Sequence, residues 1–157
     1  MVHFSAKSEY AILAILALAL HSGEGPLQVR AIAQREKIPA RFLEQVMNHL
    51  KKRGLVESVR GAHGGYRLTK SPDQICLGEV LQAMEGPLVE IDSTQRRQRE
   101  SLNGNGINGG EIESALIREI WQEVRSSVKE HLDSITFKTL SERKKEMEGK
   151  QTLMFHI

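Results

Sequence analysis

The spacing of apolar residues between Gln28 and Arg53 limits the folds that this chain can adopt. Residues 29–36 and 40–53 repeat apolar side chains every three or four positions, as amphipathic helices do. Pro39 lies between them and ends the first helix. The second helix is expected to bury the apolar residues Phe42, Leu43, Val46, Met47 and Leu50. Two short helices joined by a tight turn predict a helix-turn-helix.

The hydrophobic period changes from 3.6 to 2 directly after Gly54. This change predicts strands at 55–60 and 66–70, joined by the glycine-rich tip 61–65. Residues 75–77 are consistent with a short third strand before another helix. A basic hairpin after a helix-turn-helix is typical of a winged helix, so we predict a mainly α fold with a small β-hairpin wing.

An uninterrupted apolar run occupies residues 10–20. Eleven residues are too few to span a bilayer, which needs about 20, and Glu9 precedes the run where a secretory signal would be positive. We therefore predict a buried first helix, begun by Ser5 and ended near Gly23. We expect no membrane association and a cytoplasmic protein.

The positive charge of the chain is concentrated in the predicted winged helix. The 22 basic and 20 acidic residues leave a net charge of only +2. Residues 28–70, however, hold ten basic and three acidic residues, or +7 in this segment alone. Concentrated basic charge favours polyanions, because neutralised phosphates release condensed counterions. A solvated charged face is the alternative interpretation of the same pattern.

The C-terminal half predicts one long helix after a glycine- and asparagine-rich loop. We divide the chain into a DNA-binding domain at 1–87, a flexible loop at 88–110, a dimerisation helix with a short following helix at 111–142, and a frayed charged tail at 143–157. The long helix carries an apolar stripe that is expected to pack against a second copy. Its residues are Ile112, Leu116, Ile120, Trp121, Val124 and Val128.

Three motifs carry a likeness to a known family. Leu43-Glu44-Gln45 lies on the second short helix, the segment from Val59 to Tyr66 reads VRGAHGGY, and residues 77–80 read LGEV. In this combination the chain resembles the bacterial winged-helix regulators of the IscR, NsrR and CymR type, the Rrf-two family. The likeness covers about residues 1–87 and 111–140. It implies a homodimer that binds a palindromic promoter site, with one wing in each half-site.

Positions matching the family motifs are the candidate DNA contacts. Arg41, Glu44 and Gln45 lie on the expected recognition helix, where Glu can accept from cytosine N4 and Gln can pair with adenine. Arg60 lies in the wing, where an arginine can enter a narrow minor groove. Glu44 could instead only pair with Arg41, and the glycines could serve only the turn. The remaining candidates are Lys51 and Lys52 for phosphates, and His63, Gly64 and Gly65 at the wing tip.

The cysteine content departs from the family pattern. Many members hold an iron–sulfur cluster with three cysteines in the loop before the long helix. Residues 88–110 contain no cysteine, and Arg118 occupies a position where relatives can offer a histidine. We therefore expect no cofactor and no metal. Cys76, the single cysteine, is interpreted as a small buried residue, with a redox switch as the alternative.

The pattern as a whole predicts a sequence-specific transcriptional regulator, acting as a repressor on double-stranded promoter DNA. The alternatives are a winged-helix module that binds protein and a redox regulator that uses Cys76. The input to the regulator could be a small-molecule effector or a partner protein. We do not expect an enzyme, because no nucleophile–base pair or phosphate-binding loop is evident in the sequence.

Overall fold

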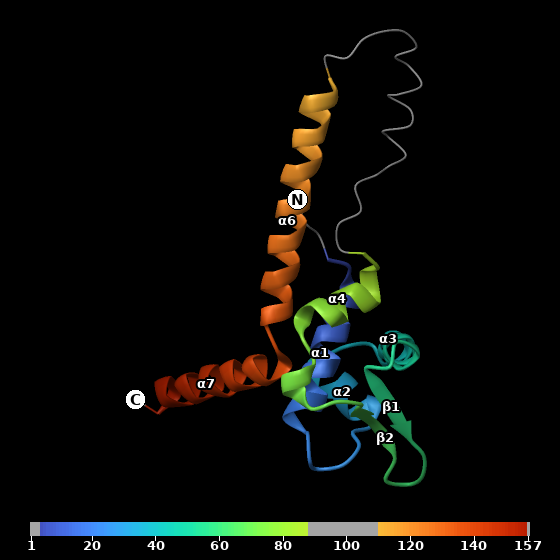
Figure 1. Cartoon of the computed structure of the whole chain (residues 1–157). Coiled ribbons are helices and arrows are strands. Elements are labelled where there is room, and N and C mark those ends of the chain that lie inside the picture. Colours follow the sequence, from blue (N-terminus) through green and yellow to red (C-terminus); the bar gives the residue numbers. More distant parts are fainter. Residues whose placement is uncertain (1–3, 88–109, 157) are drawn as a thin grey trace. The chain divides into compact units, whose positions relative to one another are not determined.

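The computed structural model describes residues 4–87 and 110–156 of the chain. It is mostly helical with one two-stranded hairpin, as predicted (Figure 1). The loop expected at 88–110 lies outside the described residues except for Gly110. The elements in chain order are α1 (Ala6–Leu20), α2 (Val29–Glu36), α3 (Ala40–Lys52), β1 (Val56–Val59), β2 (Gly65–Leu68), the 3-10 turn η1 (Pro72–Gln74), α4 (Leu77–Glu85), α6 (Glu111–Ser134) and α7 (Phe137–Phe155).

Helix α1 is the central element of the winged helix. It begins at the predicted cap Ser5, whose Oγ accepts a hydrogen bond from the Ser8 amide at 3.3 Å. Ala11, Ala14 and Ala17 are fully buried, and their small side chains let α3, α4 and α7 all contact this helix. The apolar run is therefore core, as predicted. In the described part of the chain, we find no helix long and apolar enough to cross a membrane.

A carboxylate joins the start of α1 to the end of α4. Glu85 accepts hydrogen bonds from the Ser5 amide at 2.8 Å, from Ser5 Oγ at 2.6 Å and from Ser8 Oγ at 2.5 Å. These donors, Ser5 first and then Ser8, hold the pKa of the Glu85 carboxyl below its usual value. Ser8 is fully buried and polar, so this contact also satisfies its hydroxyl.

The segment expected as a third strand pairs elsewhere. Cys76 forms an isolated antiparallel bridge with Thr136 rather than extending the hairpin. The Leu77 amide donates to the Ile135 carbonyl at 2.8 Å, and the Phe137 amide donates to the Ile75 carbonyl at 3.0 Å. This pairing brings Phe137, which is fully buried, into the core beside α1.

Helix α7 continues through the residues that we expected to fray. Its cap is Thr136, whose hydroxyl accepts from the Thr139 amide at 3.2 Å, and the helix runs from Phe137 to Phe155. Lys144 lies 3.7 Å from Glu148, one turn later, and 3.9 Å from Glu36 in α2. Such i, i+4 pairs support a helix in a charged segment. The expected boundary at 142/143 therefore falls inside a helix.

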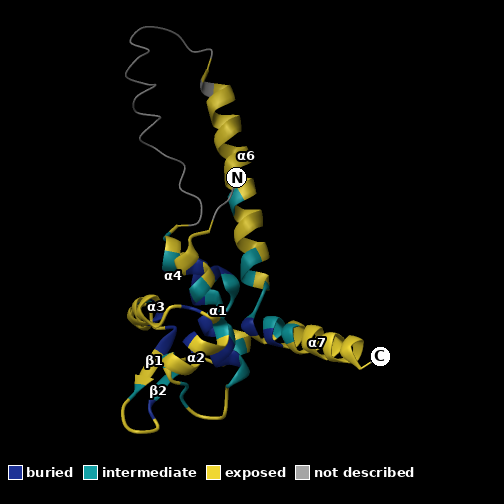
Figure 2. Cartoon of the chain, turned by 180° about the vertical axis from the view of Figure 1, so that it is seen from behind, coloured by how far each residue is buried: buried dark blue, intermediate teal, exposed yellow. Residues whose placement is uncertain are grey.

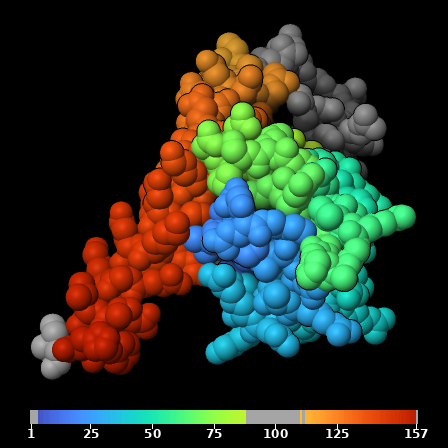
Figure 3. All heavy atoms as spheres, turned by 90° about the horizontal axis from the view of Figure 1, so that it is seen from below, coloured from blue at the N-terminus to red at the C-terminus, as the bar shows by residue number. Residues whose placement is uncertain are grey.

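The contacts within the described chain define two units. One holds α1 to α4 together with α7, and the other holds α6 as far as His131. In the first unit the buried residues line the inner faces of the helices, above all α1 (Figure 2). The space-filling view shows the same packing within this unit. The N-terminal segment, in blue, lies between the segment that follows it, in cyan, and the segment after the wing, in light green (Figure 3).

Candidate nucleic-acid interface

Helix α3 separates a buried stripe from an exposed polar face. Leu43, Val46, Met47 and Leu50 are almost completely buried against the core. On the opposite side the predicted contact residues Arg41, Glu44 and Gln45 are exposed in the first two turns, and Lys51 and Lys52 are exposed in the last. Among the described residues, no ion pair joins Arg41 to Glu44. Helix α3 is thus amphipathic, with one side in the core and a polar side open to solvent, as a recognition helix requires.

Phe42 does not belong to the core, contrary to our expectation. Its exposed fraction is 51%, whereas Leu43 beside it is fully buried. The spacing to Val46 was misleading, because Phe42 lies at the margin of the stripe formed by Leu43, Met47 and Leu50. Helix α3 thus exposes one aromatic side chain near its N-terminus.

The wing is a short antiparallel hairpin. Val56 pairs with Leu68 at its base, and Val59 pairs with Gly65 near its tip. The tip is closed by a hydrogen bond from the Gly64 amide to the Gly61 carbonyl at 3.0 Å. Arg60 and His63 are exposed there. His63 also lines an open groove of about 390 Å³ between the tip and the loop before α2.

Gly64 and Gly65 shape the wing through close backbone contacts. A Cβ atom on Gly64 would overlap the Val59 carbonyl oxygen. A Cβ atom on Gly65 would lie 2.5 Å from the Leu27 carbonyl oxygen, and the φ of Gly65 is +153°. Both positions therefore require glycine for steric reasons, and at Gly65 the backbone conformation favours it as well.

Several contacts fix the wing to the rest of the domain. Leu27 and Tyr66 exchange two backbone hydrogen bonds of 2.9 Å, which sequence reasoning did not anticipate. Tyr66 also packs against the core at the base of the wing. Lys51 Nζ donates to Ser58 Oγ at 2.6 Å, so a lysine at the end of α3 reaches the first wing strand. These contacts hold the α3 face and the wing in one arrangement.

Ion pairing leaves several cations of this surface unpaired with carboxylates. Within the +7 segment, Arg67 pairs with Glu57 across the hairpin at 2.6 Å, Lys70 pairs with Glu79 at 2.9 Å, and Arg35 pairs with Glu36 at 3.4 Å. No such pair is found, over the described ranges, for the other seven basic residues of the segment, which are all exposed: Arg30, Lys37, Arg41, Lys51, Lys52, Arg53 and Arg60. The exposed charge is therefore available to a polyanion.

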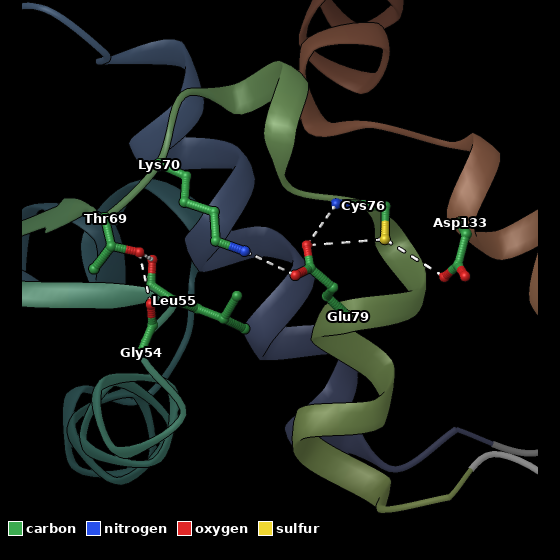
Figure 4. A network of polar contacts seen from close by, with 7 residues as sticks. All are labelled: Gly54, Leu55, Thr69, Lys70, Cys76, Glu79 and Asp133. Carbon is green, nitrogen blue, oxygen red and sulfur yellow. Dashed lines mark hydrogen bonds and ion pairs between the residues drawn. The ribbon is translucent and has the colours of Figure 1, made fainter.

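Cys76 is a helix cap. It precedes α4 and forms a capping box with Glu79, whose carboxylate accepts from the Cys76 amide at 3.3 Å (Figure 4). The Cys76 Sγ atom donates to Asp133 Oδ1 at 3.5 Å. Because Gly78 has no side chain, Asp133 can approach this helix start. The thiol is half-buried rather than buried as we expected, and the spacing of Cys76 and Glu79 was the overlooked signal.

The environment of Cys76 disfavours a thiolate. Burial raises the pKa of the Cys76 thiol, and the neighbouring carboxylates of Asp133 and Glu79 raise it further. A protonated thiol is a weak nucleophile and a poor metal ligand. This finding argues for a structural role rather than for the redox alternative.

The residues present do not fit a cysteine-held iron–sulfur cluster. The chain has one cysteine, whereas such clusters use several thiolates. That cysteine is engaged in the α4 cap. Among the described residues, no group of three or more His, Cys, Asp or Glu side chains is placed to hold a metal ion.

Helix α6 carries the predicted apolar stripe on its surface. Side chains at i, i+4 intervals follow one face of the helix, and their exposed fractions range from 42% to 81%. They are Ile112, Leu116, Ile120, Trp121, Val124 and Val128. A stripe of this length is larger than the scattered apolar residues normal on a monomer surface.

Comparison with known proteins gives consistent matches. Residues 4–143 match the model of the Rrf2 (Rrf-two) family, described as an iron-dependent transcriptional regulator. The chain is 35% identical to the HTH-type transcriptional regulator CymR of Bacillus subtilis (strain 168), over 87% of this chain and 88% of that protein. It is 34% identical to IscR of Pectobacterium atrosepticum, over 91% of this chain and 81% of that protein.

Solved structures agree with these matches. The structure of CymR from B. subtilis, described as the global cysteine regulator, matches with a TM-score of 0.71 and 34% identity, over 91% of this chain and 98% of that one. The structure of T. potens IscR matches with a TM-score of 0.68 and 32% identity, over 92% and 90%.

Replacing Gly65 by alanine should release the wing from the loop before α2. The added methyl group would meet the Leu27 carbonyl, so the two hydrogen bonds between Leu27 and Tyr66 should break. At ~1 kcal/mol for each hydrogen bond, the free energy that holds the wing to this loop should fall by about 2 kcal/mol. Amide hydrogen exchange should therefore become faster at Tyr66 and stay slow at Leu43.

Gly149→Ala is the control, because a Cβ at Gly149 meets nothing within 4 Å. Unchanged exchange at Tyr66 in the Gly65 variant would contradict the steric role of this glycine.

Proposed function

The chain belongs to the Rrf2 family of transcriptional regulators, and on this premise we propose that it represses transcription as a homodimer on a palindromic promoter site, without an iron–sulfur cluster. The observation that carries the proposal is the surface formed by α3 and the wing. Its exposed cations Arg41, Lys52, Arg53 and Arg60 lack carboxylate partners within the described chain, and hydrogen bonds hold the two elements together.

Each part of this surface has a distinct task on DNA. Glu44 accepts from cytosine N4 and Gln45 pairs with adenine in the major groove. Arg60 enters the minor groove beside the wing, where narrow A·T-rich segments concentrate negative potential. Lys51, Lys52 and Arg53 neutralise phosphates, which positions the protein without reading sequence. At the tip of the wing, His63, Gly64 and Gly65 lie close to the sugar–phosphate backbone of the DNA.

The homodimer is supported by the stripe on α6. Covering these six exposed side chains with a second copy would remove a large apolar surface from water. A twofold dimer also explains how two short recognition helices reach two half-sites of a palindrome.

DNA binding should depend strongly on salt. A protein that contacts 6–10 phosphates loses about 10³–10⁵ in affinity between 50 and 200 mM salt. Arg60→Ala should weaken binding and reduce the slope of log K against log salt by about 1. Fluorescence anisotropy on duplexes selected from a random pool by the wild-type protein measures both effects.

Lys145→Ala, which removes a basic residue from the exposed surface of α7, is the matched control for Arg60→Ala. Binding with no salt slope and no sequence preference would refute the regulator and favour a protein-docking role for the winged helix.

A charge placed in the α6 stripe should dissociate the dimer. Val124→Glu buries an unpaired carboxylate in the proposed interface, which is costly, so sedimentation should give a monomer where the wild-type protein is a dimer. Gln122→Glu adds the same charge on the opposite side of α6 and should leave the dimer intact. A wild-type monomer, or a dimeric Val124 variant, would contradict this interface.

Protein purified without oxygen should be colourless and should hold neither stoichiometric iron nor acid-labile sulfide. The reason is the donor set, because the single thiol, Cys76, caps α4 and its pKa is raised. Metal and sulfide analysis of the wild-type protein and of Cys76→Ser measures this. Stoichiometric iron that is lost in the Ser variant would refute the proposal.

A further inference from the structure

Phe42 is exposed in a part of the fold where other large apolar residues are buried. Within residues 4–87 only Phe4, at 40%, and Phe42, at 51%, are exposed large hydrophobic residues. Single exposed apolar residues are common on protein surfaces. The position of Phe42 and the chemistry of its neighbours therefore have to decide what it does.

Phe42 lies in the first turn of α3, third after the cap residue Pro39. In a helix-turn-helix, the N-terminal residues of the second helix contact base edges in the major groove. Arg41, Glu44 and Gln45 are exposed in the same two turns. Phe42 thus lies among the residues that would face the bases if the protein binds DNA as proposed above.

An apolar side chain has one specific target in the major groove. Only thymine presents a methyl group there, on C5, and phenylalanine is among the side chains that contact it. We propose that Phe42 is a specificity-determining residue that selects thymine in each half-site through this methyl group. This inference rests on the proposed DNA-binding function and adds a base preference to it.

The surroundings of Phe42 favour a base edge over a partner protein. Of the exposed residues beside it, Arg41, Glu44 and Gln45 are charged or polar and Pro39 and Ala40 are small, so Phe42 is the one large apolar side chain exposed in the first two turns of α3. Protein-binding surfaces expose contiguous apolar patches of several hundred Å². The first turn of α3 holds no acidic residue, which suits approach to a polyanion. One aromatic ring in a polar, basic setting matches one methyl group on a charged duplex.

The test removes the methyl group alone. Each thymine of a duplex selected by the wild-type protein is replaced by deoxyuridine, one symmetric pair of positions at a time. A buried CH₂ or CH₃ group contributes about 0.8 kcal/mol, or about fourfold in affinity for each half-site. Because each change alters both half-sites, the wild-type protein should bind about 16-fold more weakly when the critical symmetric pair is changed, and this is expected at one or two pairs. Phe42→Ala should bind the thymine and deoxyuridine duplexes equally.

Phe4→Ala is the matched control, because it removes the other exposed phenylalanine of this domain, outside α3. It should keep the wild-type sensitivity to deoxyuridine. Thermal melting checks each variant, and Phe42→Gln replaces Phe42→Ala if the alanine variant melts early. The glutamine variant should also lose the sensitivity.

Two results would overturn the inference while leaving the proposed function intact. Either deoxyuridine costs the wild-type protein nothing at any position, or the Phe42 variants keep the full cost. In both cases the wild-type protein would still prefer the selected duplex to a scrambled one. A wild-type protein without that preference would refute the proposed function, and the inference with it.

Discussion

The winged helix depends on the close packing of α1. Its fully buried alanines let α3, α4 and α7 approach one central helix, and interiors at crystal-like density tolerate little added volume. Its N-terminus is joined to α4 through Glu85, which accepts three hydrogen bonds from Ser5 and Ser8. The orientation of α3 therefore follows from a core of small residues on α1, away from the exposed face of α3.

The candidate interface is one joined surface rather than two independent elements. The Lys51–Ser58 contact links α3 to β1, and the Leu27–Tyr66 bridge links β2 to the segment before α2. Gly65 makes that bridge sterically possible. Fixing both elements before binding reduces the entropy that DNA binding would otherwise cost. The same surface holds the unpaired cations, so geometry and charge support one function.

The matched family is described by its dependence on iron, yet this chain places its one cysteine in a structural role. Cys76 caps α4 and contacts Asp133 near the end of α6, while Glu79 connects the cap to Lys70 beyond the wing. These contacts form a polar network of ordinary side chains at the start of α4.

The sequence by itself determined the element types, the order helix-turn-helix then hairpin, the charged segment and the apolar stripe of α6, because these follow from local periodicity and residue chemistry. It placed Phe42 in the core and ended the last helix too early. The burial of a residue at the edge of an apolar stripe, and the length of a charged helix, both depend on contacts with neighbouring residues. Only the tertiary structure decided which residues fix the wing, what Cys76 contacts and where 75–77 pair. These contacts join segments that are far apart in the chain, so a local sequence pattern cannot predict them.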